Sequence, residues 1–167
     1  KMYRLHKWLG IGGLVLSVAH WLWAKGPKWA VGLGWLDPPN RGPRPAVENA
    51  LEQFLLTQRG TAEGIGEWAF YAAVLLIVAA LVHWIPYSLF YKTHRLISVA
   101  YLALVLHAIV LLQFSYWMTP VSILMAGMLA YGTVAAILVL LRRVGAGRKV
   151  AGKIASLHYY PSLRVLE

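Results

Sequence analysis

Four histidines are the residues of this chain whose type and spacing could do chemistry. His6 and His20 stand 14 residues apart in one apolar stretch, and His94 and His107 stand 13 residues apart in another. Imidazole is a common ligand of zinc and of haem iron. Histidines inside a membrane are rare and usually functional. Metal ligation is therefore the first chemistry to consider, provided that these stretches lie in a membrane.

The composition places them there. The chain has 167 residues, of which 59% are hydrophobic and only 13% are charged, whereas soluble domains carry about 25% charged residues. A soluble fold of this length could not bury so much apolar surface, but a bilayer can cover it. The chain has no cysteine, which excludes iron–sulfur clusters, thiolate zinc sites and covalently attached c-type haem.

Four stretches are long and apolar enough to cross a bilayer as helices, which takes about 20 residues. They cover residues 5–24, 67–90, 93–117 and 120–141. Pro86 should kink or end the second helix. Tyr91-Lys92 leaves room only for a tight turn, so the second and third helices should be antiparallel neighbours. We therefore predict an all-α integral membrane protein, with an antiparallel bundle of four transmembrane helices over residues 1–143.

A long loop, residues 25–66, joins the first two predicted spans. It begins with the turn-forming residues Gly26-Pro27. Its second half predicts a short amphipathic helix from Pro45 to Gly60. The apolar stripe of that helix consists of Val47, Leu51, Phe54 and Leu55. The helix could lie at the membrane surface or cover a buried cofactor, and both interpretations stay open.

The basic residues predict the orientation of the bundle. Eleven of the 16 Lys and Arg residues, with one acidic residue, lie on the side that holds residue 1, the 91–93 turn and the basic linker 144–167. The side of loop 25–66 carries five basic and five acidic residues. Short cytoplasmic segments are rich in Lys and Arg, so we expect the loop outside, in a bacterial inner membrane or plasma membrane. This distribution explains the net charge of +10 without nucleic acid as a partner.

Helical geometry places the four histidines at two levels. Fourteen residues turn a helix through about 1400°, so His6 and His20 share one face and lie about 21 Å apart. Gly13 and other small residues on that face leave a groove for a flat macrocycle or, equally, allow close helix packing. Thirteen residues leave about 220° after whole turns, so a straight helix would not align His94 with His107.

The levels of the two pairs nevertheless match, with His6 and His94 near the cytoplasmic ends and His20 and His107 near the outer ends. Zinc would need four ligands that converge on one point, and the two levels are about 20 Å apart. A haem iron with two axial imidazoles carries electrons, because it has no open position for a substrate. We therefore predict one haem between each pair. The alternative is four histidines satisfied by interhelical hydrogen bonds.

Several neighbours of these pairs have two possible roles. The inner pair, His6 and His94, is flanked by Arg4, Lys7 and Arg95. These basic residues could contact haem propionates, or they could only anchor the helix ends. His83 could bond a propionate or face a polar gap. Tyr101 could stand between the haems as a stepping stone for electrons, although packing is the simpler role.

Two segments resemble a known family. The run Tyr3-Arg4-Leu5-His6-Lys7-Trp8-Leu9-Gly10 on to His20, and Thr93-His94-Arg95 on to His107, are similar to the ferric reductase-like transmembrane domain of ferric reductases and NADPH oxidases. That family spaces histidines by 13 or 14 residues on two helices and uses them as ligands of two b-type haems. Both spacings occur here. Intact members usually have six spans, so we expect this chain to be part of a longer protein.

The resemblance implies an oxidoreductase. Electrons would pass from NAD(P)H through FAD, in a cytoplasmic domain that follows residues 144–167 or in a partner protein. They would reach the inner haem on His6 and His94, then the outer haem on His20 and His107, and leave to ferric iron or oxygen outside. An aromatic residue that some members carry between the haems is Ala100 here.

Two alternative functions stay open at this point. The chain could be a cytochrome b subunit that exchanges electrons with quinone or with a separate partner. Less simply, it could be a transporter or structural membrane protein without a cofactor.

Overall fold

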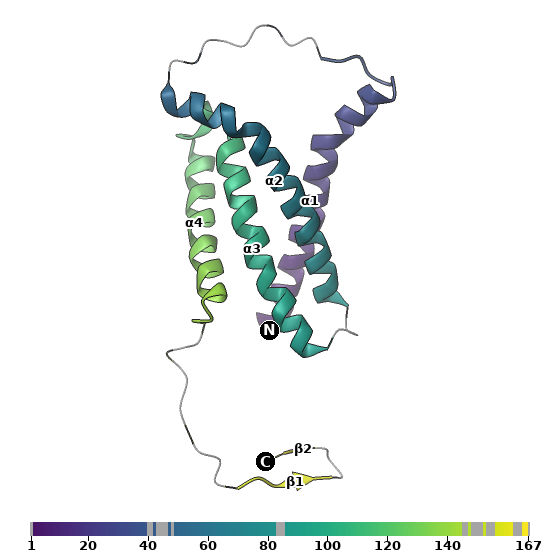
Figure 1. Ribbon diagram of the computed structural model, residues 1–167, viewed down its shortest axis with the longest axis vertical. Helices are drawn as coiled ribbons and strands as arrows, with labels where there is room; N and C mark the ends of the chain where they lie inside the picture. The colour runs from purple at the N-terminus through teal and green to yellow at the C-terminus, as the bar shows by residue number, and fades with distance from the viewer. Residues whose placement is uncertain are drawn as a thin grey trace.

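Four helices dominate the computed structural model, which describes residues 2–39, 42, 47, 49–82, 86–144, 147, 152, 156–161 and 165–166. The helices are α1 (Met2–Gly32), α2 (Ala50–Leu81), α3 (Tyr87–Leu111) and α4 (Pro120–Leu140), and a short 3-10 helix, η1 (Phe114–Tyr116), precedes α4. Figure 1 shows the chain passing back and forth along one long axis through these helices. Within the described residues, α2, α3 and α4 are long and apolar enough to cross a membrane.

The first helix is longer than predicted, because the expected turn at Gly26-Pro27 is wrong. Pro27 lies inside α1, which continues to Gly32. The φ that proline fixes is compatible with a helix, and proline destabilises a helix because one hydrogen bond is lost and the ring clashes with the preceding turn. Packing between side chains on either side of the proline can offset this cost. Trp29 packs edge-on against Trp21, with ring centres 5.2 Å apart, and this contact bridges the turn that contains Pro27.

The end of α1 is set by Gly34, whose φ of 74° lies in the left-handed region. Its N–H donates to the carbonyl of Val31, and the N–H of Trp35 donates to the carbonyl of Ala30. This is a common glycine-dependent way to end a helix. Glycines, tryptophans and a histidine lower the hydropathy of the stretch 8–24, and α1 is not among the helices apolar enough to cross a membrane.

The second helix joins two elements that the sequence predicted separately. Asn49 caps its start, where the side chain accepts the N–H groups of Leu51 and Glu52. Gly60 does not end the amphipathic segment, which continues as the same helix to Leu81. A single glycine costs a helix only about 1 kcal/mol. Figure 1 shows the first turns of α2 crossing the end of the bundle before the helix descends beside α3. Pro45 lies outside the described residues.

The break between α2 and α3 falls at Pro86 rather than at Tyr91-Lys92, so the predicted start of the third span at Thr93 is wrong. Pro86 has no N–H to donate and disfavours helix in the residue before it, but it precedes the first turn of a new helix readily. It stands at the N-cap of α3. As a result, Tyr91 and Lys92 lie inside α3, which ends at Leu111 instead of Trp117.

Helix contacts are made by small residues, and large apolar side chains face outward. The buried apolar residues that the structure describes are all alanines: Ala62, Ala69, Ala100 and Ala136. Most Leu, Val, Ile and Trp side chains are exposed, which suits a lipid surround, where small residues let helices approach closely. Beyond α4, which covers the predicted fourth stretch, β1 (Tyr159–Tyr160) and β2 (Val165–Leu166) pair as an antiparallel hairpin.

Candidate functional site

The structure brings His6 and His94 together from two helices. Their ring centres are 5.9 Å apart, and their planes meet at 74°. A metal ion bound by two imidazole nitrogens at about 2 Å each would place the ring centres roughly 6 Å apart. The inner pair that the sequence predicted therefore has the spacing of two axial ligands.

The surroundings of His94 also suit a ligand. Phe90 stacks on its ring, with centres 5.1 Å apart and planes 19° apart. Its Nδ1 atom is buried and has no hydrogen-bond partner among the described residues. Because α3 begins at Tyr87, His94 lies about two turns inside the helix rather than at its end. A buried imidazole nitrogen without a partner is costly unless something else occupies it.

His107 is held in a different way, by helix α2. Its Nδ1 lies 2.9 Å from the carbonyl oxygen of Ala62. A carbonyl oxygen only accepts hydrogen bonds, so in the neutral ring Nδ1 is the donor and Nε2 has the lone pair. Histidines that bind metals usually donate their other ring N–H to a carbonyl or carboxylate in this way. His107 is therefore prepared to bind through Nε2.

The outer pair is not brought together as the inner pair is. His20 is exposed on α1, and no ring contact or hydrogen bond joins it to His107 among the described residues. On α3, His94 meets α1 while His107 meets α2. This agrees with the 220° between them, which predicted that a straight helix would not align the two side chains.

The face of α1 between its histidines is open. A Cβ added at Gly10 or Gly13 would have no atom from another described part of the chain within 4 Å. The sequence allowed either a groove or close helix packing at Gly13, and the structure has no close packing there. Together with the contact between His6 and His94, this leaves room beside α1 for a flat group.

The neighbouring basic residues have varied surroundings. Arg95 points to α4, where its Nη2 donates to the carbonyl oxygen of Leu140 at 2.7 Å. Arg4 and Lys7 are exposed at the start of α1, so contact with a propionate stays a prediction for them. Tyr101 donates to the carbonyl of Leu129 at 3.2 Å and packs into α4. His83 lies outside the described residues.

A polar clamp that the sequence interpretation missed ties α1 to α2 at the loop end. Lys25 Nζ lies 2.8 Å from Glu67 Oε2, and the Tyr71 hydroxyl donates to Glu67 Oε1 at 2.7 Å. Trp21 packs beside them, stacked on Phe70 with ring centres 5.5 Å apart. Lys25 directly follows the first predicted span, and Glu67 begins the second on the same side of the membrane. Their ion pair could therefore have been predicted from the sequence.

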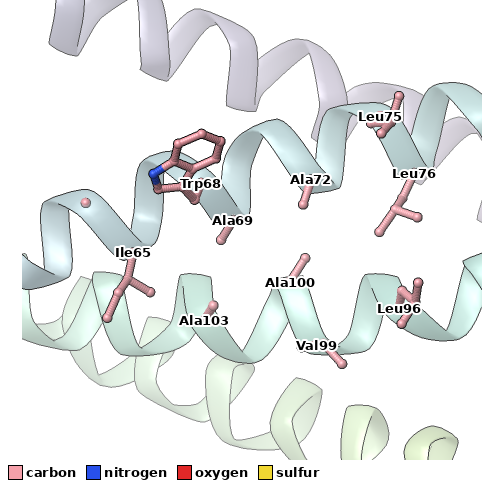
Figure 2. Close-up of a pocket in the computed structure, with 11 residues that line it drawn as sticks. Ile65, Trp68, Ala69, Ala72, Leu75, Leu76, Leu96, Val99, Ala100 and Ala103 are labelled. Carbon is pink, nitrogen blue, oxygen red and sulfur yellow. The ribbon is translucent and has the colours of Figure 1, made fainter.

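The structure also contains an apolar groove of about 760 Å³ between α2 and α3. Figure 2 shows alanine and leucine side chains from both helices lining it, with Ala100 pointing toward α2. None of its lining residues is titratable, so it offers no ligand or proton donor for redox chemistry. No histidine is among its lining residues.

Comparison with known proteins decides the family. The model of the family described as "Ferric reductase like transmembrane component" matches residues 1–105. The chain belongs to this family. The matched range contains His6, His20 and His94 and ends two residues before His107. No curated protein and no solved structure matches the chain.

Membership identifies a transmembrane redox protein in an integral membrane setting, because members of the ferric reductase-like family are generally oxidoreductases that use haem and flavin. The donor set fits haem better than a free metal ion. Among the described residues, no three His, Cys, Asp or Glu side chains gather into a metal site. Two imidazoles are sufficient ligands only where a macrocycle supplies the others, and the inner pair offers two.

Proposed function

We propose that this ferric reductase-like chain carries electrons across a membrane through two b-type haems. His6 and His94 would hold the inner haem, and His20 and His107 the outer one. Each bound haem would supply an iron that accepts and releases one electron at a time. The observation that carries the proposal is the contact between His6 and His94, which come from separate helices and have the spacing of axial ligands.

The helices set the distance over which electrons travel. His6 and His20 are about 21 Å apart along α1, and His94 and His107 about 20 Å apart along α3. With α1 as a fourth span, antiparallel to α2, one imidazole from each of two helices would lie near each membrane surface. The His107 hydrogen bond to Ala62 supports the outer site from the α3 side. The open face at Gly13 supports it from the α1 side.

The direction of transfer follows from charge. Figure 1 places the start of α1, the end of α2, the start of α3 and the end of α4 at the same end of the bundle. Together with the residues that follow α4, these segments carry eleven of the 16 Lys and Arg residues, which favours the cytoplasm for that end. A flavin domain or protein that takes electrons from NAD(P)H would then donate to the inner pair. The acceptor outside would be ferric iron or oxygen.

Vesicles test this function directly. Haem-loaded chain is reconstituted into liposomes that contain trapped ferricyanide, and dithionite is added outside. Neither ion crosses a lipid bilayer readily, so consumption of ferricyanide reports electron transfer through the protein. We expect consumption with the natural chain and its loss in His94→Ala and His20→Ala.

The matched control is His158→Ala, which makes the same change at an exposed histidine in the tail. It should transfer electrons at the rate of the natural chain. If His94→Ala also keeps that rate, electrons do not pass through the inner pair and the proposal fails.

A further inference from the structure

Gly66 lies directly against the imidazole of His107. It is buried on α2, and a Cβ added there would overlap Nδ1 of His107 and would lie 2.5 Å from Cγ and 2.6 Å from Cε1. Real Cβ atoms essentially never come within 3.0 Å of heavy atoms from other parts of the chain. The His107 ring can therefore occupy its position only because residue 66 has no side chain.

The same face of α2 also supplies the ring's hydrogen bond. Ala62 precedes Gly66 by four residues, which places both on one face of the helix. The carbonyl oxygen of Ala62 accepts the Nδ1–H of His107 at 2.9 Å. Ala62 is only 3% exposed, so water has little access to compete for this bond. We call Ala62 and Gly66 the His107 seat.

Small residues at these positions could also serve only to bring α2 close to α3, as small residues do in many membrane helix pairs. The contacts at Gly66 indicate more than this. The three atoms nearest to an added Cβ all belong to the His107 ring, and none belongs to the backbone of α3. The absence of a side chain at residue 66 accommodates the imidazole itself.

We propose that the His107 seat positions His107 as a ligand of the outer haem. The Ala62 carbonyl fixes the proton on Nδ1, which leaves Nε2 as the binding atom. Gly66 lets the ring reach that carbonyl. This inference rests on the proposed function for the outer pair, and it assigns positioning residues to α2, a helix that carries none of the four ligands.

The test compares two glycines of one helix. In Gly66→Ala the His107 ring must leave the seat and lose its hydrogen bond to the Ala62 carbonyl. Loss of the hydrogen-bond partner of a metal-binding histidine typically lowers metal affinity by about 10- to 100-fold. We expect purified Gly66→Ala chain to contain one haem instead of two, with half of the Soret absorbance lost. The remaining haem should keep the midpoint potential that the natural chain shows for its inner haem.

Gly64→Ala is the matched control. A Cβ at Gly64 meets nothing within 4 Å, and alanine is the better helix former at both positions. General weakening of α2 therefore cannot explain a loss that is confined to Gly66→Ala. Gly64→Ala should keep two haems with unchanged potentials. If Gly66→Ala does the same, the seat has no role in positioning His107 and the proposal is overturned.

A double variant covers the case in which Gly66→Ala fails to fold. In Gly66→Ala with His107→Ala the added Cβ has no ring to strike, so the protein should fold and hold one haem, as His107→Ala alone does. If the double variant also fails to fold, Gly66 serves helix packing rather than His107, and the inference is wrong.

The failure of the proposed function would look different, because the natural chain and Gly64→Ala would then both lack haem. The seat is still measurable in that case by NMR of isotope-labelled histidine. The Nδ1–H tautomer of His107 should be present in the natural chain and lost in Gly66→Ala, and its presence in both would overturn the seat.

Discussion

Arg95 provides a test of how the histidine-bearing helix α3 is tied to α4. Its Nη2 donates to the carbonyl oxygen of Leu140 at 2.7 Å. The last carbonyls of a helix have no partner within it, so this bond caps α4 from the side. Arg95→Met keeps the length and apolar stem of the side chain and removes the guanidinium group.

The expected cost follows from the geometry of this bond. A hydrogen bond to a charged group contributes about 1.5–3 kcal/mol, and a cation at a helix C-terminus adds about 0.3–1 kcal/mol. Residues 141–144, which follow Leu140, are exposed, so water can replace part of the bond and the lower half of this range applies. We expect Arg95→Met to lower the free energy of unfolding by about 2 kcal/mol. For a chain of this size that corresponds to about 4–8 °C in Tm.

The assay is thermal unfolding of purified protein in detergent, followed by circular dichroism. Arg143→Met is the control, because it removes the same charge from the same end of α4 at an exposed side chain. Arg95→Met should melt well below Arg143→Met. The midpoint potential of the inner haem should be the same in both, because the structure directs Arg95 to α4. Equal melting temperatures would refute the stabilising role of the bond between Arg95 and Leu140, and a potential shift confined to Arg95→Met would instead support a propionate contact.

Three further outcomes are expected from the same unfolding assay. Gly132→Ala should destabilise the fold by about 1–3 kcal/mol, because its Cβ would lie 2.7 Å from Tyr101 Cζ. The control is Gly127→Ala, whose Cβ meets nothing within 4 Å and which should be neutral or stabilising. Lys25→Met should lower the melting temperature only slightly, because its ion pair with α2 is partly exposed, and a loss unaffected by salt would contradict a role for that pair. Asn49→Ala should cost about 1 kcal/mol through the lost cap of α2, whereas Asn49→Asp should melt like the natural chain.

The sequence predicted the parts of the site that depend on helix geometry alone. The 14-residue spacing of His6 and His20 and the 13-residue spacing of the other pair follow from the period of a helix, and the structure agrees that His94 and His107 point to different neighbours. The contact between His6 and His94 was predicted because both lie at the same level of their spans. The family match supports a transmembrane redox function for the chain, and the role of that contact in haem binding stays a prediction.

Helix boundaries were less predictable, because the local signals were ambiguous. Pro86 separates two helices, as expected of a residue that has no N–H to donate. The polar pair Tyr91-Lys92 predicted a turn but lies inside α3. Pro27 does not end α1, because aromatic packing between Trp21 and Trp29 holds the helix together across it. That contact joins side chains on different turns of the helix, so the signal of the proline alone did not reveal it.

The supporting contacts of the site could not be read from the sequence at all. The Arg95 bond to Leu140 and the His107 bond to Ala62 each join residues 45 positions apart. They exist only because α3 packs between α2 and α4. Gly66 has no sequence signature that distinguishes it from Gly64, and only the position of the His107 ring gives it a role.

The pairing of the four histidines is tested most directly by haem content and redox titration of single alanine variants. The natural chain should contain two low-spin haems with two midpoint potentials. His6→Ala and His94→Ala should each lose the same one of these, and His20→Ala and His107→Ala should each lose the other. A chain without haem, or single variants that all keep two haems, would contradict the account.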